Sequence, residues 1–324
     1  MKAEARTNVD LRALCTFKIG GSARQVFFPR SIGELALAVK ASRDSNGSFF
    51  IVGRGSNIVF SSQEVVTPLI LTGELSRLLL AAGFRDAPDW TRPAFKAAGS
   101  APLVYCECGV GNSALIAFTI EKGLGDLTLL AGVPGSFGGA LAMNAEGVMN
   151  ALEGNLWIAE LGGRENDEIG VHPSSEYQYS YRASSVQATI AFAALIRLSP
   201  KEPEAMRASV EEARTRRAST QPYDLPSAGS VFRNPEGDYA GRLLEAAGMK
   251  GTRVGGAEFS RIHANFIVNA GDATGEDVLE LMNLGKRTVW EEFQVSLAPE
   301  VKFVGDFDPE KLAYLHKDLQ QGNE

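Results

Sequence analysis

Apolar residues recur with the period of an α-helix in the segment 275–293. The apolar positions Val278, Leu281, Met282, Val289 and Phe293 fall on one face of such a helix. Thr274 precedes the segment as an N-cap, and Glu276 and Asp277 place acidic side chains in the first turn, where they complement the helix dipole. The pattern predicts a capped helix that packs this face on a sheet.

Short apolar runs bounded by turn residues predict strands in the first part of the chain. They occur at residues 24–28, 49–52, 58–60, 67–71, 103–108, 156–161 and 188–198. Ser31 and Glu34 have the spacing of a capping box for a helix that runs to Asn46 and stops at Gly47. Asn112 is expected to cap a second helix, up to Lys122. The segment 83–102 is rich in Pro, Gly and charge, and we expect an exposed excursion there.

The character of the sequence changes near residue 200. A charged helix is predicted for residues 204–220, followed by a helix over 238–247, a hairpin at Gly255 and Gly256, and a strand over 265–269. The polar tail after Leu315 is expected to fray. This change marks a candidate domain boundary.

Composition limits the classes of function. A chain of 324 residues with 44% hydrophobic residues is expected to form two or three domains with real cores. The net charge of −7 argues against nucleic acid or an anionic membrane as the main partner, although a small anionic substrate needs only a few local cations. The first residues lack an apolar signal core, and no stretch reaches the roughly 18 apolar residues of a membrane span, so we expect a cytoplasmic protein.

Few side chains in the sequence offer obvious chemistry. The three histidines are scattered and the three cysteines show no zinc-like pairing with them, so no metal site is predicted. Cys106 and Cys108 would share one face of a strand, and two buried reduced thiols are favoured over a redox pair. A hydroxyl, Ser230, lies in a turn bounded by Gly229 and Pro235, beside basic and amide donors. If the reaction is a redox reaction, a cofactor must carry it.

Three glycine-rich segments could hold such a cofactor. Residues 109–114 match a dinucleotide fingerprint, but no acidic residue follows about 20 positions later, which argues against a nicotinamide-binding fold. Residues 131–140 could approach a phosphate with backbone N–H groups, or could simply form a turn that needs positive φ angles. Residues 53–57 form a third glycine turn between two strands.

A set of motifs spread over nearly the whole chain resembles the UDP-N-acetylenolpyruvoylglucosamine reductase family. The motifs are Thr16–Ala23, Gly53–Asn57, Gly132–Gly139, Met143–Ala145, Tyr181–Ser184, Gly229–Pro235, Ala247–Gly251, His263–Phe266 and Pro299–Val301. Each is weak alone, but their joint order is specific. The spacing from Tyr181 to Ser230 resembles the shorter class of this family, which lacks an added tyrosine loop.

The resemblance implies an α+β fold with an FAD-binding half of the p-cresol-methylhydroxylase (PCMH) type. Residues 1–200 would form this half from two α+β lobes, about 1–70 and 71–200. Residues 201–300 would form an α+β substrate-binding domain, followed by a C-terminal tail at 301–324.

The resemblance also implies a two-stage reaction and its residues. NADPH would reduce non-covalently bound FAD, and the flavin would then reduce UDP-N-acetylglucosamine enolpyruvate to UDP-N-acetylmuramate in peptidoglycan synthesis. Ser230 would donate the proton, and Arg182 and Glu300 would accompany the enolate-like intermediate. An ionised Glu300 would oppose that charge, so its role requires that it be protonated or share a proton. Taken alone, each of the three would more often be an ordinary turn or surface residue.

Binding residues follow from the same motifs. The flavin would be bound by Gly53, Arg54, Gly55, Ser56, Asn57, Gly132, Val133, Pro134, Gly135, Ser136, Gly138, Gly139 and Asn144. The substrate would be bound by Asn234, Lys250 and His263. Glu146 departs from the family, which usually has glycine then alanine after the Met143–Ala145 motif, and the 83–102 segment is longer than usual.

Two other functions are compatible with parts of this pattern. A sugar or lactone oxidase or dehydrogenase of the same flavin fold would not need Ser230, Lys250 and Glu300. A non-catalytic UDP-sugar-binding or flavin-binding protein is disfavoured because all three proposed catalytic positions hold chemically competent residues.

Overall fold

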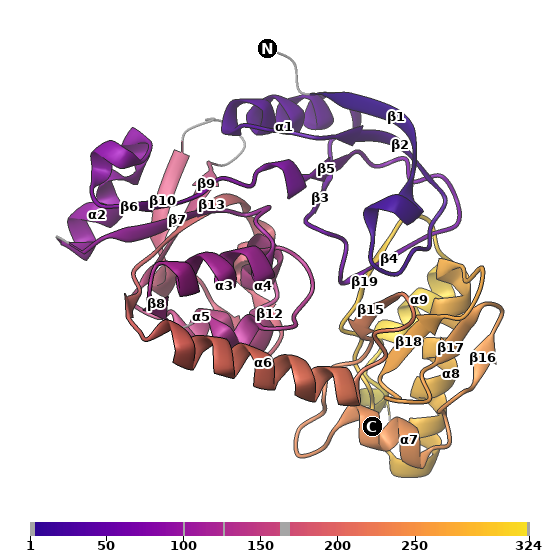
Figure 1. Ribbon diagram of the computed structural model, residues 1–324. Coiled ribbons are helices and arrows are strands. Elements are labelled where there is room, and N and C mark those ends of the chain that lie inside the picture. Colours follow the sequence, from indigo (N-terminus) through magenta and orange to yellow (C-terminus); the bar gives the residue numbers. More distant parts are fainter. Residues whose placement is uncertain (1–3, 100, 126, 163–168, 323–324) are drawn as a thin grey trace. The chain divides into compact units, whose positions relative to one another are not determined.

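The computed structural model describes residues 4–99, 101–125, 127–162 and 169–322, which form an α+β structure (Figure 1). The chain divides into two compact units, each assembled from separate stretches of sequence. The first contains Met1–Ala5, Phe27–Arg54 and Leu69–Arg216, and the second contains Arg6–Val26, Gly55–Pro68 and Arg217–Glu324. None of the helices in the described ranges combines the length and apolar character needed to cross a membrane.

An antiparallel five-stranded sheet organises the first unit, with the order β10-β9-β13-β7-β6. The strands are β6 (Leu78–Ala81), β7 (Leu103–Glu107), β9 (Leu156–Leu161), β10 (Ile169–Pro173) and β13 (Ile190–Ile196). The central pairing places Ala194 opposite Cys106 and Leu195 opposite Tyr105. All residues of β7 are buried, as expected for a central strand covered on both faces.

The alternation of side chains along these strands divides the unit into two cores. Val104 and Cys106 point into one core and Leu103 and Tyr105 into the other. The first core is covered by α3 (Asn112–Glu121), α4 (Phe137–Ala142) and α5 (Val148–Ala151), which Figure 1 shows on one side of the sheet. The second core is covered by α1 (Ile32–Asn46) and α2 (Arg92–Ala98).

The segment 83–102 is not the exposed excursion that its composition suggested. Ala94, Phe95 and Ala98 on α2 are buried in the second core. Trp90 packs beside them, with its ring centroid 5.2 Å from that of Phe192. The prediction was wrong because Ala94, Phe95 and Ala98 lie on the face of α2 that covers the sheet.

Local helix signals had mixed outcomes. The Ser31 hydroxyl accepts a hydrogen bond from Glu34 N at 3.2 Å, and Gly47 ends α1 with φ 70°, as predicted. Asn112, however, is not the cap of α3, since the helix is preceded by Gly111. The Asn112 side chain instead donates to the carbonyl of Val133 at 3.2 Å.

Smaller elements complete the first unit. Parallel β3 and β5 pair with each other, as do antiparallel β8 and β14, and β11 and β12. Their bounds are β3 (Phe50–Val52), β5 (Leu69–Leu71), β8 (Leu124–Gly125), β11 (Tyr179–Ser180), β12 (Ala183–Ser184) and β14 (Ser199–Pro200). Helix α6 (Pro203–Thr220) begins in this unit, and its last turn belongs to the second.

Short 3-10 turns occur along the described part of the chain. They are Leu11–Leu14, Thr72–Glu74, Phe84–Asp86, Asp89–Thr91, Thr128–Leu130, Ala145–Gly147, Ser174–Glu176, Ser185–Ala188 and Leu319–Gly322.

The second unit is built on a four-stranded antiparallel sheet of order β15-β18-β17-β16. Its strands are β15 (Ser227–Ser230), β16 (Arg253–Val254), β17 (Ala257–Phe259) and β18 (Phe266–Asn269). Helix α8 (Gly275–Phe293) packs on this sheet and α7 (Ala240–Ala246) packs against α8. A Cβ at Gly285 of α8 would meet Phe259 of β17 and Leu244 of α7. Strand β4 (Ile58–Phe60) pairs in parallel with β19 (Lys302–Val304), and β1 (Ala5–Asp10) neighbours β2 (Ser22–Phe27).

The predicted capped helix is present as α8. The Thr274 hydroxyl accepts from Asp277 N at 3.1 Å, and the Asp277 carboxylate accepts from Thr274 N at 2.9 Å, which forms a capping box. Val278, Leu281 and Met282 are buried. The predicted amphipathic pattern is therefore confirmed.

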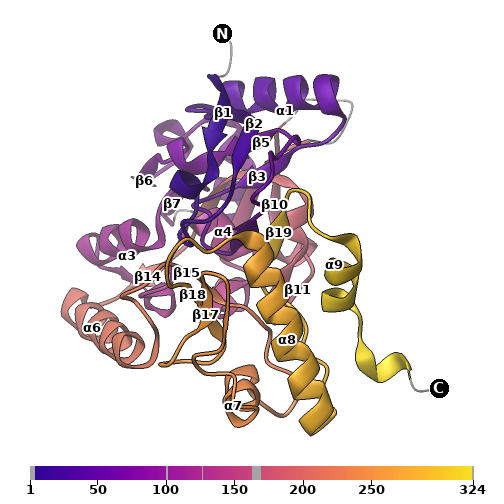
Figure 2. The ribbon, with the colours of Figure 1, turned by 90° about the vertical axis from the view of Figure 1, so that its right-hand side faces the viewer.

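The C-terminal stretch is held more firmly than its polarity suggested. Helix α9 (Pro309–His316) lies along α8 (Figure 2). The buried Lys286 ammonium donates to the carbonyls of Leu315 at 2.7 Å and Lys317 at 2.6 Å. Leu319 N donates to the Ser296 hydroxyl at 3.0 Å, so the tail that was expected to fray is ordered as far as this residue.

Candidate active site

The loop from Gly132 to Gly139 lies against the end of β7 in the first unit. Gly138 N donates to the carbonyl of Cys108 at 3.0 Å, and a Cβ at Gly138 would lie only 2.5 Å from the Cys108 Cβ. Gly132 and Gly135 have φ angles of 75° and 108°, which favour glycine. The glycines of this motif are therefore required by close backbone packing.

Gly53 and Arg54 meet this loop inside the first unit. A Cβ at Gly53 would lie 2.6 Å from the Ser136 hydroxyl, which caps α4 by accepting from Gly139 N at 3.4 Å. The Arg54 guanidinium lies against Gly111, where a Cβ would be 3.2 Å from its Cζ. Gly53 is thus a neighbour in space of the Gly132–Gly139 loop, although the two are far apart in the sequence.

This arrangement fits the diphosphate of a flavin dinucleotide. The backbone N–H groups of Gly135 and Ser136 donate to none of the described residues. Arg54 adds a positive charge nearby. Backbone donors in a glycine-rich turn beside a cation are the usual means of binding a dinucleotide phosphate. Val133 and Pro134 lie within the same loop.

The dinucleotide-like motif at 109–114 has a structural explanation. A Cβ at Gly109 would lie 1.9 Å from the carbonyl oxygen of Thr72, so only glycine fits. Glycine is therefore needed for close packing, at position 109 against Thr72 and at position 111 against Arg54.

Asn144 is among the buried residues of the predicted flavin-binding set. It is 3% exposed, and its amide donates to Ser180 O at 2.9 Å and to Asn150 Oδ1 at 3.0 Å. Its side-chain oxygen accepts from Met149 N at 2.9 Å. The Asn144 side chain therefore joins the turn that follows α4 to the hairpin that carries Arg182.

Arg182 occupies the tip of the β11–β12 hairpin with φ 56°. Its guanidinium lies 5.6 Å from the centre of the Tyr181 ring, and its Nη2 lies 3.4 Å from Oε1 of Glu146. The sequence singled out Glu146 only as a departure from the family pattern. Its contact with Arg182 could not be found from sequence, because the two residues are far apart in the chain and meet only through the fold.

Ser230 and Glu300 come together on paired backbone segments of the second unit. Glu300 N donates to the carbonyl of Val231 at 2.8 Å, and Phe232 bridges to Pro299. The Ser230 hydroxyl is partly exposed and has no hydrogen-bond partner within the described ranges. Two of the three predicted catalytic residues thus sit on neighbouring backbone segments, while Arg182 belongs to the first unit.

Asn57 also hydrogen-bonds the segment that contains Glu300. Its side-chain amide donates to Glu300 O at 3.1 Å, and its carbonyl accepts from Lys302 N at 2.9 Å. Gly55 precedes it with φ 62°, where a Cβ would collide with the Leu14 carbonyl at 2.3 Å. Gly55 and Asn57 therefore have a clear structural role in the second unit.

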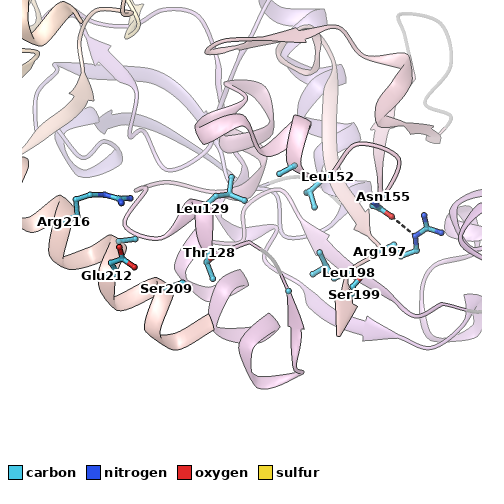
Figure 3. Close-up of a pocket in the computed structure, with 13 residues that line it drawn as sticks. Thr128, Leu129, Leu152, Asn155, Arg197, Leu198, Ser199, Ser209, Glu212 and Arg216 are labelled. Atoms are coloured by element: carbon cyan, nitrogen blue, oxygen red, sulfur yellow. Dashed lines mark hydrogen bonds between the residues drawn. The ribbon is translucent and has the colours of Figure 1, made fainter. Parts of the chain in front are cut away.

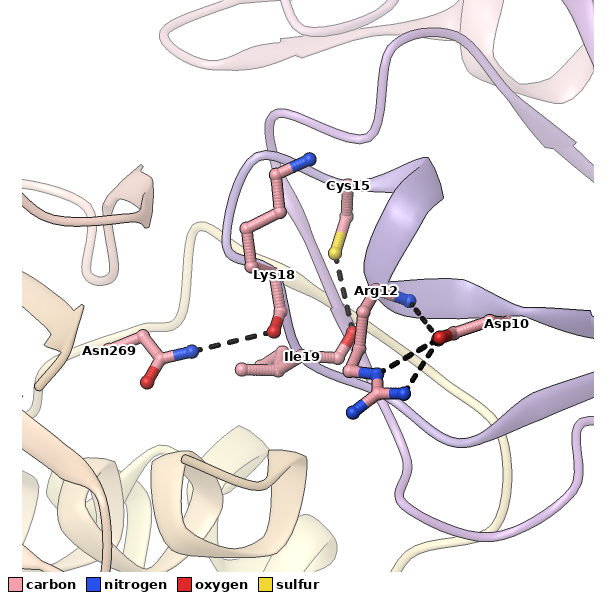
Figure 4. Close-up of polar contacts among 6 residues, drawn as sticks. All are labelled: Asp10, Arg12, Cys15, Lys18, Ile19 and Asn269. Carbon is pink, nitrogen blue, oxygen red and sulfur yellow. Dashed lines mark hydrogen bonds and ion pairs between the residues drawn. The ribbon is translucent and has the colours of Figure 1, made fainter. Parts of the chain in front are cut away.

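The motif Thr16–Ala23 supports the strand of Ser230. The Thr16 hydroxyl donates to Ser227 O at 2.8 Å, and the Asn269 amide donates to the Lys18 carbonyl at 3.4 Å (Figure 4). Within the same loop the Cys15 thiol donates to Ile19 O at 3.3 Å (Figure 4). These bonds tie the motif to both β15 and β18.

The three predicted substrate-binding residues lie around α7, with Asn234 and His263 at its first turn and Lys250 near its end. Asn234 Oδ1 accepts from Ala240 N at 3.1 Å, and the His263 ring fills the space beside Gly241, where a Cβ would be 2.7 Å from its Cε1. Burial and the nearby charge of Lys250 lower the pKa of His263. Lys250 itself pairs with Glu245 at 2.7 Å.

The protonation of His263 follows from its contacts. Asn265 N donates to its Nδ1 at 3.1 Å, so Nδ1 is the acceptor and Nε2 carries the proton of the neutral ring. The cluster therefore offers one cation, Lys250, and one neutral N–H donor, His263.

Cys106 and Cys108 are free and buried, as predicted for reduced thiols, and so is Cys15. Burial raises the pKa of Cys108 to about 12 and that of Cys106 well above its usual value, so both are poor nucleophiles near neutral pH.

A separate pocket of about 560 Å³ lies in the first unit beside α6 (Figure 3). Thr128, Arg197 and Ser209 are among the residues that line it, and the Arg197 guanidinium donates to Asn155 Oδ1 at 2.8 Å. None of the predicted site residues lines this pocket, and we assign it no function.

Comparison with known proteins places this geometry in a family. Residues 221–304 match the family model described as UDP-N-acetylenolpyruvoylglucosamine reductase, C-terminal domain. The UDP-N-acetylenolpyruvoylglucosamine reductase of Anaeromyxobacter dehalogenans is 43% identical over 316 residues, covering 97% of this chain and 90% of that protein. The enzyme of the same name from Alkaliphilus oremlandii is 34% identical over 293 residues, covering 90% of each chain.

The chain belongs to the UDP-N-acetylenolpyruvoylglucosamine reductase family. A crystal structure of the UDP-N-acetylenolpyruvylglucosamine reductase from Thermus caldophilus is similar, with a TM-score of 0.71 and 28% identity over 93% of this chain and 98% of that one. These findings confirm the family and the α+β fold class predicted from the motifs. They also confirm the prediction of an FAD-dependent oxidoreductase.

Proposed function

We propose that this reductase-family chain reduces UDP-N-acetylglucosamine enolpyruvate to UDP-N-acetylmuramate, with NADPH as the reductant, in peptidoglycan synthesis. The observation that carries the proposal is the pairing of the Ser230 strand with the Glu300 segment, with the Ser230 hydroxyl left without a protein partner in the described part of the chain. A proton donor needs a hydroxyl that is held in place and still available.

FAD would be held non-covalently by Gly53, Arg54 and the Gly132–Gly139 loop, with Gly55, Ser56 and Asn57 contributing further donors. The chemistry that bound FAD supplies is transfer of a hydride from NADPH to the outer carbon of the enolpyruvyl group. Arg54 and the backbone N–H groups of Gly135 and Ser136 would orient its diphosphate. Asn144 would support this site through the turn that it stabilises.

The protein's own residues would manage the charge that results. Addition of hydride to the outer carbon leaves negative charge on the neighbouring carbon and its carboxylate. Arg182 would stabilise that charge, and Ser230 would donate a proton to the carbon next to the carboxylate. Glu300 would contribute as a protonated or proton-sharing group, since a second anion there would oppose the reaction.

The substrate nucleotide would be bound by the cluster of Asn234, Lys250 and His263 around α7. Lys250 supplies a cation for the diphosphate, His263 offers its Nε2–H, and Asn234 offers the amide N–H groups that its bond to Ala240 leaves available. These are contacts of the right chemistry for a sugar nucleotide.

The domain assignment and location belong to the same proposal. Residues 1–200 would form the PCMH-type FAD-binding domain, with lobes of about 1–70 and 71–200, residues 201–300 the substrate-binding domain, and residues 301–324 the C-terminal stretch. A cytoplasmic location is supported by three cysteines that are free and buried, as is usual in a reducing compartment.

Anaerobic half-reactions test this function. NADPH should bleach the flavin absorbance of the purified protein, and addition of UDP-N-acetylglucosamine enolpyruvate should restore it. UDP-N-acetylglucosamine, which lacks the enolpyruvyl group, is the matched control and should leave the flavin reduced. If oxygen alone restores the absorbance, the proposed reaction is wrong and an oxidase of the same fold is favoured.

A further inference from the structure

Glu146 and Arg182 form a partly buried ion pair in the first unit. Arg182 Nη2 lies 3.4 Å from Glu146 Oε1, and the two side chains are 23% and 34% exposed. Both are therefore largely removed from water, which makes their mutual attraction stronger than that of a surface pair.

Backbone strain concentrates around this pair. Arg182, Glu146 and Asn144 have φ angles of 56°, 51° and 43°. They are three of the seven non-glycine residues with positive φ in the part of the chain that the structure describes. Side chains at such positions cost free energy that glycine avoids, so the residues are kept there by what their side chains do.

The backbones that carry the pair are fastened to each other. The Asn144 amide donates to the carbonyl of Ser180 in the Arg182 hairpin at 2.9 Å. The Asn144 oxygen accepts from Met149 N at 2.9 Å, which closes the turn that contains Glu146. These bonds fix both backbones, but they do not fix the long side chain of Arg182. The ion pair with the Glu146 carboxylate restrains that side chain.

We propose that Glu146 is a positioning residue that holds the Arg182 guanidinium in place for the substrate carboxylate. The inference rests on the proposed function, which assigns Arg182 to that carboxylate. An arginine held in position before the reaction stabilises developing charge without having to reorganise. Because that charge grows during the reaction, loss of Glu146 should lower kcat more than it raises KM.

The test uses two variants of the FAD-loaded enzyme. Glu146→Gln removes the charge, and Glu146→Gly removes the side chain while suiting the positive φ. We expect either variant to slow flavin reoxidation by the substrate, and kcat, by about 10-fold to 100-fold, as a misplaced catalytic group does. KM for the substrate should stay within about 2-fold, because uniform binding is unchanged. Flavin reduction by NADPH and the FAD content should match the wild type.

A double-mutant cycle separates positioning from an independent effect. In an Arg182→Ala background, Glu146→Gln should have no further effect on reoxidation, since its target is gone. Glu121→Gln, which removes an exposed pair with Lys122 in the same unit, is the control and should react like the wild type.

Three results would overturn the proposal. The first is a wild-type rate of flavin reoxidation in Glu146→Gln. The second is a loss of reoxidation rate from Glu146→Gln that is as large in the Arg182→Ala background as in the wild type, and the third is a lower KM with unchanged kcat in Glu146→Gln, which would mean that Glu146 competes with the substrate for Arg182. Failure of the proposed function is distinguishable, because the wild type itself would then not be reoxidised by the substrate.

Discussion

At the scale of single residues, the Ser230 hydroxyl is the group on which the proposed chemistry most directly depends. Gly229 precedes it with φ 79°, and the pairing of β15 with β18 is irregular between Ser227 and Ser230. Such an irregularity redirects a side chain relative to a regular strand. The local backbone thus turns the Ser230 hydroxyl away from a regular strand position, while β15 stays paired with β18.

Replacing Ser230 by alanine should separate the two chemical steps. We expect turnover to fall by about 10²-fold to 10⁴-fold, the usual worth of a positioned proton donor. Flavin reoxidation on adding the substrate should fall less, because hydride delivery does not use the hydroxyl. Stopped-flow absorbance and product formation in deuterated water measure the two steps. Ser227→Ala, in the same strand, is the control and should turn over like the wild type. Wild-type turnover in Ser230→Ala would show that Ser230 is not the proton donor.

Lys286 makes a second prediction at this scale, concerning pH and stability. Its side chain is 1% exposed, and burial lowers its pKa to about 8. In the unfolded chain a lysine titrates near pH 10.4, so between about pH 8 and pH 10.4 the unfolded state binds more protons than the folded state. The contribution of Lys286 to the free energy of unfolding should therefore rise with pH across this window.

The comparison is with Lys286→Met, which has no such group. Relative to the variant, the wild type should gain about 2 kcal/mol in unfolding free energy between pH 8 and pH 10. Urea denaturation at several pH values measures this difference. Parallel pH profiles for the two proteins would show that Lys286 titrates normally in the folded state.

At the scale of elements, the sequence was most informative where a signal acts within one turn. Ser31 caps α1 and Thr274 caps α8 as predicted, because a capping bond joins residues only three positions apart. The buried face of α8 likewise follows from its own period. The family motifs also led to the correct family, because they fix both residue type and order over nearly the whole chain.

Elements whose role depends on distant neighbours were not predictable. Asn112 has the right type and position for a cap, but its amide bonds Val133 instead. The 83–102 segment has the composition of a loop, yet Phe95 and its neighbours cover the second core. The Glu146–Arg182 pair arises only when the turn after α4 meets the β11–β12 hairpin. Tertiary packing decides each of these cases, and no local pattern encodes it.

At the scale of the whole molecule, neither unit is a continuous piece of chain. Residues 6–26 and 55–68 belong with the C-terminal part, where Thr16 bonds Ser227 and Asn57 bonds Glu300. The N-terminal motifs of the family therefore support the backbone segments that carry Ser230 and Glu300. Changes in those motifs are expected to affect the proposed catalytic residues even though they are remote in sequence.

Flavin binding should be visible in the stability of the whole chain. A ligand that binds only the folded state stabilises it by mass action, by about 2.7 kcal/mol at a free concentration 100 times Kd. Gly53→Ala should reduce this effect, because the new Cβ would lie 2.6 Å from the Ser136 hydroxyl and force it out of its capping position on α4. Loss of that cap costs about 1 kcal/mol by itself.

The expected outcome is a large rise in Tm when FAD is added to the wild-type apoprotein and a much smaller rise for Gly53→Ala at the same FAD concentration. Gly33→Ala is the matched control, because a Cβ at Gly33 in α1 meets nothing within 4 Å. Thermal unfolding with and without FAD measures both shifts. If FAD raises the Tm of Gly53→Ala as much as that of Gly33→Ala, the flavin diphosphate does not bind where Gly53 meets Ser136. In that case the distorted cap of α4 would have left the affinity for FAD unchanged.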